Sequence, residues 1–425
     1  MENNKAPEDK YSFNYWSFYL LGMITMLPWC FFLAAEQYWQ FKFRDVSGGN
    51  FTVANQTQLQ IRFQSNLAVT ASVPTTICLI LHACFGYFIP LQLRIVGTQT
   101  MMILTLMITS ILTQVDTDSW QNEFFWITMA CAFIANASSS TLAGTVFSLA
   151  GQFPSRYVSS VVSGQAISGI FISVVTIVTI STGVSAPMVA FFCFSIGTVA
   201  ICASLTCYFY ASRRPFFLYY IALTQTSKRI SSIDDRPLRM QNKSWRTTRF
   251  IRIFRKVRLF GFALWLAFVV TQAAHPAITL KVVPQQKGTV WTDVYFVPVI
   301  NYLVFFLSDY VGRLSAEFLE WPATNDVKTC LLAVVRIAFV PAFLACNVQP
   351  RGNLPVLIQS DEIFIALIIG FGFGNGYLSN ISMIGAPLAV EQPDKEMAAA
   401  IMTGFLGVGL ACGSILSWIT VVIIS

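Results

Sequence analysis

The sequence predicts an all-α membrane protein with eleven transmembrane helices, and two observations lead to this fold class. Of the 425 residues, 55% are hydrophobic and only 11% are charged, whereas a soluble domain carries about 25% charged residues. Stretches poor in charge recur from one end of the chain to the other, and each approaches the roughly 20 residues that cross a bilayer as a helix. We therefore expect lipid to surround most of the chain.

The expected spans fall into a group of six and a group of five, separated by a polar segment. They lie near 14–37, 65–88, 95–115, 124–149, 158–181 and 187–210, and then near 259–280, 294–318, 329–347, 363–388 and 399–423. This division predicts an N-terminal six-helix bundle over 1–211 and a C-terminal five-helix bundle over 259–425.

The polar segment 212–258 carries thirteen Lys or Arg residues, against which stand only Asp234 and Asp235. Cytoplasmic loops of membrane proteins hold an excess of Lys and Arg, so we expect this segment to be a basic cytoplasmic loop. Six spans before it then place the N-terminus in the cytoplasm. Five spans after it place the C-terminus outside the cell.

The loop between the first two spans, residues 38–63, should then be extracellular. It contains two acceptor sequences for N-glycosylation, at Asn50 and Asn55. Such sequences also arise by chance, but two of them in a loop that the charge bias places outside agree with the predicted topology. We expect both asparagines to be glycosylated.

The basic loop 212–258 has two interpretations. A cluster of cations is able to bind nucleic acid. A cytoplasmic loop that faces anionic lipid headgroups is also expected to be basic, and gains about 1 kcal/mol for each cation near the membrane surface. The second interpretation explains the charge without a further partner, so we expect contact with anionic lipid and no nucleic acid.

Ionisable side chains lie inside the eighth expected span. Asp309, Arg313 and Glu317 follow one another at intervals of four residues, so they share one face of a helix. Charges at such depth are costly unless they are paired or face a polar cavity. A structural brace within the helix explains Glu317 best, whereas Asp309 and Arg313 together offer an acceptor and donors to a polar solute.

The seventh expected span contains His275 followed by Pro276. Proline removes a backbone hydrogen bond and loosens a helix, and a histidine beside it could exchange a proton near neutral pH. A neutral, hydrogen-bonded core histidine is the other interpretation.

No motif in the sequence supports catalysis, a metal site or a cofactor. The glycines of FGFGNG (371–376) lie within an apolar span with no preceding strand, so they form no phosphate-binding loop. We therefore expect a protein that is not an enzyme and that needs no cofactor or metal. A receptor or an intramembrane enzyme remains a remote rival to a transporter.

Several segments resemble signatures of the equilibrative nucleoside transporters. They are LLGMITMLPWC in the first expected span, SLAGQFPSRY and VSGQAISG in the fourth and fifth, SDYVGR followed by WP in the eighth, GNGYLSN in the tenth and AAAIMTGFLGVGLACGS in the eleventh. The resemblance covers nearly the whole chain. It implies an eleven-helix relative of the major-facilitator architecture, which carries nucleosides, and in some members nucleobases, through a central cavity by alternating access.

The resemblance also implies positions for the solute. Trp29 matches an aromatic residue that lines the cavity, with Met26 and Leu33 on the same face of the first helix. Leu410 matches an apolar cavity position in the last helix. Asp309 and Arg313 match a pair associated with the hydroxyl groups of the ribose.

Four positions depart from the pattern of the family. Cys30 and Phe306 stand where Asn is common, Ala143 stands where many members have Gln, and His275 stands where Phe is common. These changes alter the groups that can contact the base, so the choice between nucleosides and nucleobases stays open. A proton-coupled carrier, with His275 or Asp309 taking the proton, also stays open. The plasma membrane is the expected location.

Overall fold

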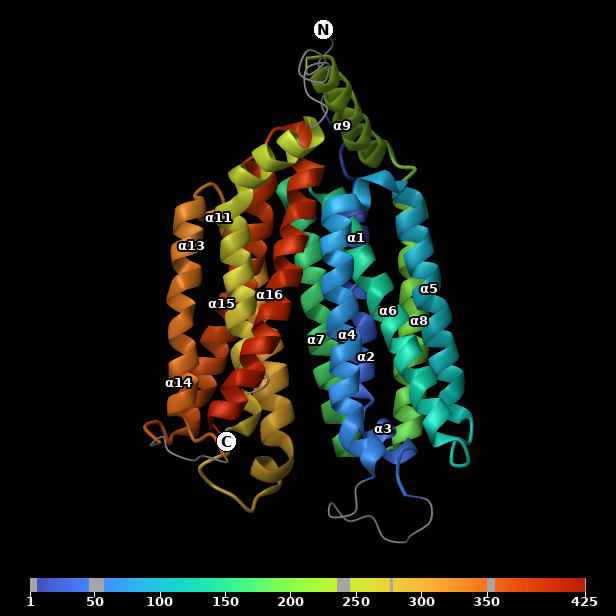
Figure 1. Ribbon diagram of the computed structural model, residues 1–425, viewed down its shortest axis with the longest axis vertical. Coiled ribbons are helices and arrows are strands. Elements are labelled where there is room, and N and C mark those ends of the chain that lie inside the picture. The colour runs from blue at the N-terminus through green and yellow to red at the C-terminus, as the bar shows by residue number, and fades with distance from the viewer. Residues whose placement is uncertain (1–5, 46–56, 235–244, 276–277, 350–355, 425) are drawn as a thin grey trace.

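The structure is a computed structural model that describes residues 6–45, 57–234, 245–275, 278–349 and 356–424. Nearly all of these residues lie in helices, and the described part of the chain contains isolated β-bridges but no β-strand. The long helices run side by side along the longest axis of the molecule (Figure 1).

The first part of the chain forms one half of the molecule, on the right in Figure 1. Its helices are α1 (Phe13–Ile24), α2 (Leu27–Ala34), α3 (Glu36–Lys42), α4 (Gln58–Phe85), α5 (Leu91–Gln114), α6 (Gln121–Ala150), α7 (Ser155–Thr182) and α8 (Ala186–Ala211).

The second part of the chain forms the other half, on the left in Figure 1. Its elements are α11 (Trp245–Ala274), the π-helices η5 (Trp291–Tyr295) and η6 (Val297–Val304), and the α-helices α12 (Phe305–Leu319), α13 (Asp326–Val335), α14 (Phe339–Ala345), α15 (Asp361–Leu388) and α16 (Lys395–Ile424).

The two halves pack against each other through a few helices. Within the first half, α1 packs along α7 and α4 packs along α6. Within the second half, α11 packs along α16 and α12 along α15. Contacts between the halves join α7 to α12 and α15, and join α16 to α4 and α6. Any site between the halves is therefore bordered by these helices.

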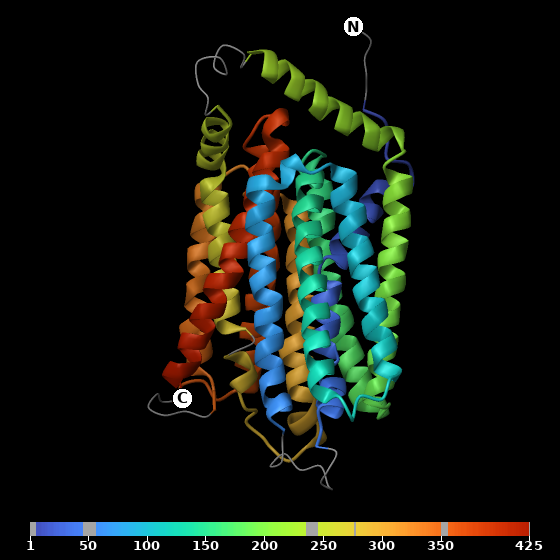
Figure 2. The same ribbon diagram turned by 45° about the vertical axis from the view of Figure 1, so that its right-hand side comes forward.

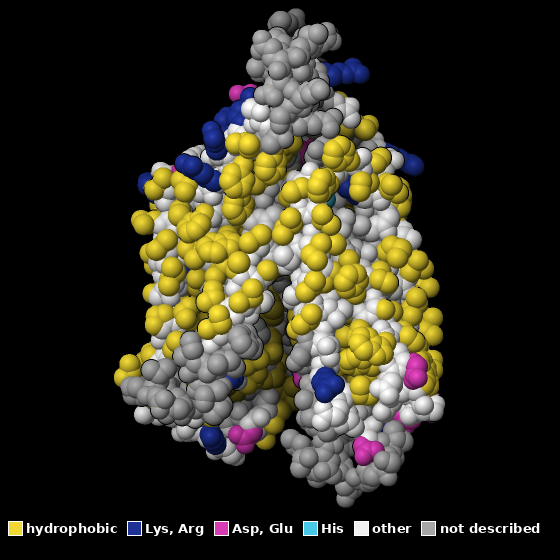
Figure 3. Space-filling model, in the orientation of Figure 1, with side chains coloured by type: hydrophobic (Ala, Val, Ile, Leu, Met, Phe, Trp, Pro, Cys, Tyr) yellow, Lys and Arg dark blue, Asp and Glu magenta, His cyan; other side chains and the backbone are white. Residues whose placement is uncertain are grey.

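Ten helices in the described part of the chain are long and apolar enough to cross a membrane. Their outer faces carry exposed apolar side chains, such as Leu93, Met101 and Ile111 on α5. Figure 3 shows apolar side chains spread over the middle of the molecule, with most of the visible charges near its two ends. The prediction of an α-helical protein that spans a membrane several times is confirmed.

The eighth expected span, 294–318, differs from a single α-helix. Residues 291–295 and 297–304 form π-helices, and only the fifteen residues of α12 that follow have α geometry. Pro298 near the start of η6 has no N–H to donate to the preceding turn. The hydropathy pattern could not reveal this widening of the helix.

The first expected span, 14–37, is interrupted. Helix α1 ends at Ile24 and α2 begins at Leu27, with Pro28 in the first turn of α2. Pro28 cannot donate a backbone hydrogen bond, so the carbonyl group one turn earlier lacks its usual partner. The LPW sequence was the signal that the helix breaks here.

The described residues of the basic segment 212–258 are largely helical. Helix α9 (Pro215–Asp234) crosses one end of the molecule (Figure 2), and α11 already begins at Trp245. A segment with few helix breakers, such as 216–234, forms a helix even when it is polar. We refer to this end of the molecule as the α9 end, and to the opposite end, where α3 lies, as the α3 end.

Close packing of α12 against α15 depends on a glycine. A Cβ atom added at Gly376 would lie 1.8 Å from the carbonyl oxygen of Asp309. This glycine therefore allows two backbones to touch, as is common between helices in membranes.

We expect Gly376→Ala to destabilise the protein, because the added methyl group forces α15 away from the helix that carries Asp309. Overpacking of this kind costs about 1–3 kcal/mol. Thermal unfolding of the purified protein in detergent measures the effect. Gly97→Ala is the matched control, since no atom lies within 4 Å of a Cβ added there. An equal unfolding temperature for both variants would contradict the expectation.

Candidate functional site

A cavity of about 190 Å³ lies between the two halves next to the break in the first span. We name it the Trp29 cavity. Four of the residues implied by the resemblance line it: Met26, Trp29, Ala143 and Leu410. Polar side chains from several helices complete the wall, namely Thr75, Asn136, Ser139, Ser140, Gln165, Gln272 and Ser414. The cavity thus combines an aromatic ring with hydrogen-bonding groups.

Side chains from the neighbouring helices hold the broken backbone beside this cavity. Ser139 of α6 donates a hydrogen bond to the carbonyl oxygen of Thr25. Ser168 of α7 donates to the carbonyl oxygen of Met23 at 2.8 Å, and Gln165 donates to the Thr25 hydroxyl at 3.0 Å. The Met23 carbonyl also accepts from the amide of Met26 at 3.2 Å. Polar groups at the break thus find partners within the protein, as groups inside a membrane must.

Asp309 and Arg313 form a buried ion pair on α12, with 2.7 Å between Nε and Oδ2. Asn375 of α15 donates to the other carboxylate oxygen at 2.6 Å. Arg313 also crosses to the first half, where it donates to the carbonyl oxygen of Val162 at 2.6 Å. Both members of the pair lie outside the set of residues that line the Trp29 cavity.

The ion pair is one end of a longer buried chain of polar groups. The hydroxyl of Thr271 lies 2.8 Å from the amide oxygen of Asn375, and Arg336 donates to that hydroxyl at 3.1 Å. Arg336 also donates to the carbonyl oxygens of Ala267 and Phe371. Through this chain, α11, α15 and the 3₁₀ turn that contains Arg336 fix the orientation of the Asp309 carboxylate.

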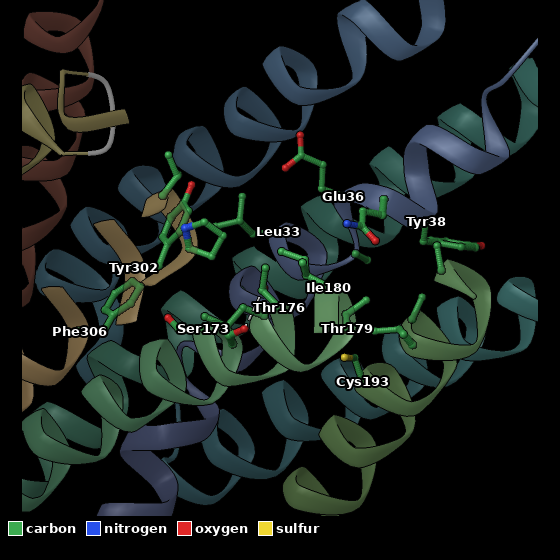
Figure 4. A pocket seen from close by; sticks show the side chains of 18 of the residues that line it. Leu33, Glu36, Tyr38, Ser173, Thr176, Thr179, Ile180, Cys193, Tyr302 and Phe306 are labelled. Atoms are coloured by element: carbon green, nitrogen blue, oxygen red, sulfur yellow. Dashed lines mark hydrogen bonds between the residues drawn. The ribbon is translucent and has the colours of Figure 1, made fainter. Parts of the chain in front are cut away.

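A second cavity, of about 400 Å³, lies closer to the α3 end. We name it the Glu36 cavity. Leu33 and Phe306 line it together with Glu36, Ser173 and Tyr302 (Figure 4). Leu33 and Trp29 lie one turn apart on α2, so the two cavities follow one another along the same helix. No pattern along the chain indicates this cavity, because its walls come from five separate segments.

Four predicted site residues line neither cavity: the paired Asp309 and Arg313, and also Cys30 and His275. Cys30 is buried, with 7% of its surface exposed. His275 is also buried, where its Nδ1 lies 2.9 Å from the hydroxyl of Thr279 and its ring stacks on Phe305 at 4.1 Å between centroids. Of the two interpretations of His275, the hydrogen-bonded core histidine describes these contacts. Asn50 and Asn55 lie outside the described residues.

Polar contacts join the two halves at the α9 end. Glu317 of α12 accepts hydrogen bonds from the hydroxyls of Tyr15 at 3.2 Å and Ser159 at 2.8 Å. Tyr19 and Tyr310 pair through their hydroxyls at 3.1 Å. The sequence suggested only a brace for Glu317, because its partners are far away along the chain. The halves are thus bonded at the α9 end, while the larger cavity lies near the α3 end.

Comparison with known proteins places this arrangement in a family. The sequence profile described as "Nucleoside transporter" matches residues 127–422. The chain belongs to the nucleoside transporter family. It is 30% identical to human equilibrative nucleoside transporter 2 and 29% identical to human equilibrative nucleoside transporter 1, and each alignment covers 99% of both chains.

The fold of this nucleoside transporter family member also occurs in other transporters. The structure matches the proton:xylose symporter XylE with a TM-score of 0.63 at 12% identity, over 97% of this chain and 88% of the symporter. It matches the human organic anion transporter MFSD10 with a TM-score of 0.54 over 97% of this chain and 95% of that one. The major-facilitator-like architecture expected from the sequence is confirmed.

We expect Glu317→Ala to loosen the α9 end, because it removes the acceptor for Tyr15 and Ser159. Hydrogen–deuterium exchange of the purified protein should then increase in the first turns of α1 and α7. Ser315→Ala is the control, since that hydroxyl bonds only to the carbonyl of Val311 in its own helix. Exchange that is equal in the two variants would show that Glu317 does not hold the halves together.

Proposed function

We propose that the protein carries nucleosides across a membrane down their concentration gradient, by alternating access. The observation that supports this most is the Trp29 cavity, which lies between two packed halves and joins an aromatic side chain to a ring of polar groups. The human relatives of 29% and 30% identity are named equilibrative nucleoside transporters. Downhill transport requires no cofactor.

The chemistry of the cavity suits a nucleoside. A flat base gains from contact with an aromatic ring, and Trp29 offers one, flanked by Met26 and Leu410. A ribose offers hydroxyl groups that donate to a carboxylate and accept from a guanidinium group. Asp309 supplies the carboxylate and Arg313 supplies the guanidinium group. We propose that both release the partners that they hold in this conformation and bind the sugar instead.

We further propose eleven spans, with the N-terminus in the cytoplasm and the C-terminus outside. The ten long helices, together with the helical segment from Trp291 to Leu319, supply that number. Helix α1 begins near the α9 end and α16 ends near the α3 end (Figure 1), which agrees with an odd number of crossings. The excess of Lys and Arg in 212–258 supports a cytoplasmic α9 end.

The plasma membrane is the proposed location, and the cations of 212–258 are proposed to contact anionic headgroups at its inner surface. Arg255 and Arg258 in the first half of α11 are exposed, as such contacts require. A nucleobase carrier or a proton-coupled carrier is the alternative function. The buried Asp309 supports the latter, because a carboxylate within a membrane is a typical proton acceptor in carriers.

Cells that express the protein should accumulate radiolabelled uridine and adenosine above the level of control cells, without a pH gradient. Hypoxanthine tests the nucleobase alternative in the same assay. Faster uptake when the outside is made acidic, and abolition of that increase by a protonophore, would favour proton coupling. If none of these solutes accumulates in cells that display the protein at the surface, the proposed function is wrong.

Trp29→Ala should raise the nucleoside concentration needed for half-maximal uptake by about tenfold, because stacking of a base on an aromatic ring contributes about 1–3 kcal/mol. Trp126→Ala is the matched control, since Trp126 is 70% exposed on the outer face of α6. Surface labelling should show equal amounts of both variants. Equal half-maximal concentrations would remove Trp29 from the proposed site.

A further inference from the structure

Gln272 of α11 contributes a carboxamide to the wall of the Trp29 cavity. Among the described residues that line this cavity, it is the one carboxamide from the second half of the molecule. The side chain is partly buried, and no hydrogen bond joins it to any other residue that the structure describes. Its amide oxygen and its amide nitrogen are therefore both available to a solute in the cavity.

The other two carboxamides in the described wall of the cavity come from the first half and already hold the protein. Nδ2 of Asn136 donates to the carbonyl oxygen of Ala132 at 2.8 Å. Nε2 of Gln165 donates to the hydroxyl of Thr25 at 3.0 Å. A solute must compete with these bonds at Asn136 and Gln165, whereas it meets no such competition at Gln272.

The hydroxyl groups of the second-half wall have also used their protons. Thr403 donates to the carbonyl oxygen of Ala400 at 2.8 Å, and Ser414 donates to the carbonyl oxygen of Leu410 at 2.8 Å. A hydroxyl group that donates to its own helix still accepts a hydrogen bond but has no second proton to give. Gln272 is therefore the side chain of this wall that offers a solute both donors and an acceptor.

The packing around Gln272 fixes the root of its side chain. A Cβ atom added at Gly413 of α16 would lie 2.6 Å from the Cβ of Gln272, so the backbone of α16 approaches α11 closely here. The preceding residue, Thr271, is bonded to Asn375 and Arg336. A fixed root with an unoccupied amide at its end is the arrangement expected of a residue that binds a ligand.

Gln272 and Trp29 belong to different halves of the molecule. A base that stacks on an aromatic ring keeps its hydrogen-bonding groups at its edge, in the plane of the base. In the first-half wall, Ala143 offers only a methyl group to such an edge. A base that contacts both Trp29 and Gln272 would join the two halves.

We propose that the Gln272 carboxamide binds the edge of the base, and that it makes the site accept bases with an exocyclic amine and bases with a carbonyl group alike. This inference rests on the proposed function. It assigns recognition of the base to a residue of the second half, outside the Asp309–Arg313 pair.

The lack of preference follows from the chemistry of a carboxamide, which donates through its nitrogen and accepts through its oxygen. The amine of adenine donates to the oxygen while the neighbouring ring nitrogen accepts from the amide. With hypoxanthine the ring N–H donates and the carbonyl oxygen accepts, and rotation of the amide by about 180° matches this reversed pattern. A purine with hydrogen at this position keeps only the ring nitrogen, so it forms one hydrogen bond instead of two.

Competition between three purine nucleosides tests the proposal. In cells that express the unchanged protein, adenosine and inosine should each inhibit the initial uptake of labelled uridine at a concentration about fivefold lower than purine riboside does, because each forms one more hydrogen bond. Gln272→Met has a side chain of similar length without the amide. It should bring both ratios close to one.

Gln92→Met is the matched control, since Gln92 is exposed in the first turn of α5 and lines neither cavity. It should keep the ratios of the unchanged protein. If Gln272→Met transports too little, the same ratios are obtained from the concentration at which each nucleoside raises the unfolding temperature of the purified protein.

Ratios near one in the unchanged protein, or ratios that Gln272→Met leaves intact, overturn this inference and leave the proposed function standing. Absence of all nucleoside uptake by the unchanged protein at the cell surface overturns the proposed function as well.

Discussion

The structure depends on one constraint: a polar group inside a membrane must find its partner within the protein. At the break between α1 and α2, Ser139 and Ser168 donate to the backbone carbonyls of Thr25 and Met23. The Asp309 carboxylate is held in the same way by Arg313 and Asn375. Departures from regular helix geometry lie beside the cavities. The break between α1 and α2 borders the Trp29 cavity, and the π-helix η6 lines the Glu36 cavity.

The same constraint explains the asymmetry between the two ends. At the α9 end, tyrosine, serine and glutamate side chains pair across the halves, so little polar surface there is left for a solute. Near the α3 end the corresponding space is a cavity lined by hydroxyl groups and Glu36. When a solute or water replaces the hydrogen bonds between the halves, one half is able to rock against the other.

Much of the fold could be predicted from the sequence, because the bilayer imposes a length and a composition on each span. The spans and their order follow from that pattern, and Trp29, Met26, Ala143 and Leu410 do line one cavity. The break at Pro28 had a local signal in the LPW sequence. The π-helices before α12 had a weaker signal, Pro298 within the expected span.

Other features depend on contacts between distant segments. Glu36 stands at the end of an apolar stretch, where a carboxylate is usually explained by the membrane surface, and only the packing of α7 and η6 beside it reveals a cavity. Arg336 reaches Asp309 through Thr271 and Asn375, which belong to two other helices. Cys30 and His275 occupy positions that the resemblance implies for the solute, yet the structure buries them away from both cavities.

The π-helices η5 and η6 have a mechanical consequence. A π turn holds more residues than an α turn, so the helix that carries Asp309 contains extra chain on the side of the Glu36 cavity. Loss of one residue from that turn would rotate the preceding segment by about 100° relative to α12. Tyr302 would then face another neighbour while Asp309 kept its place. The wall of the Glu36 cavity and the Asp309–Arg313 pair therefore lie on two parts of one helical segment. The π turns between these parts allow one part to rotate relative to the other.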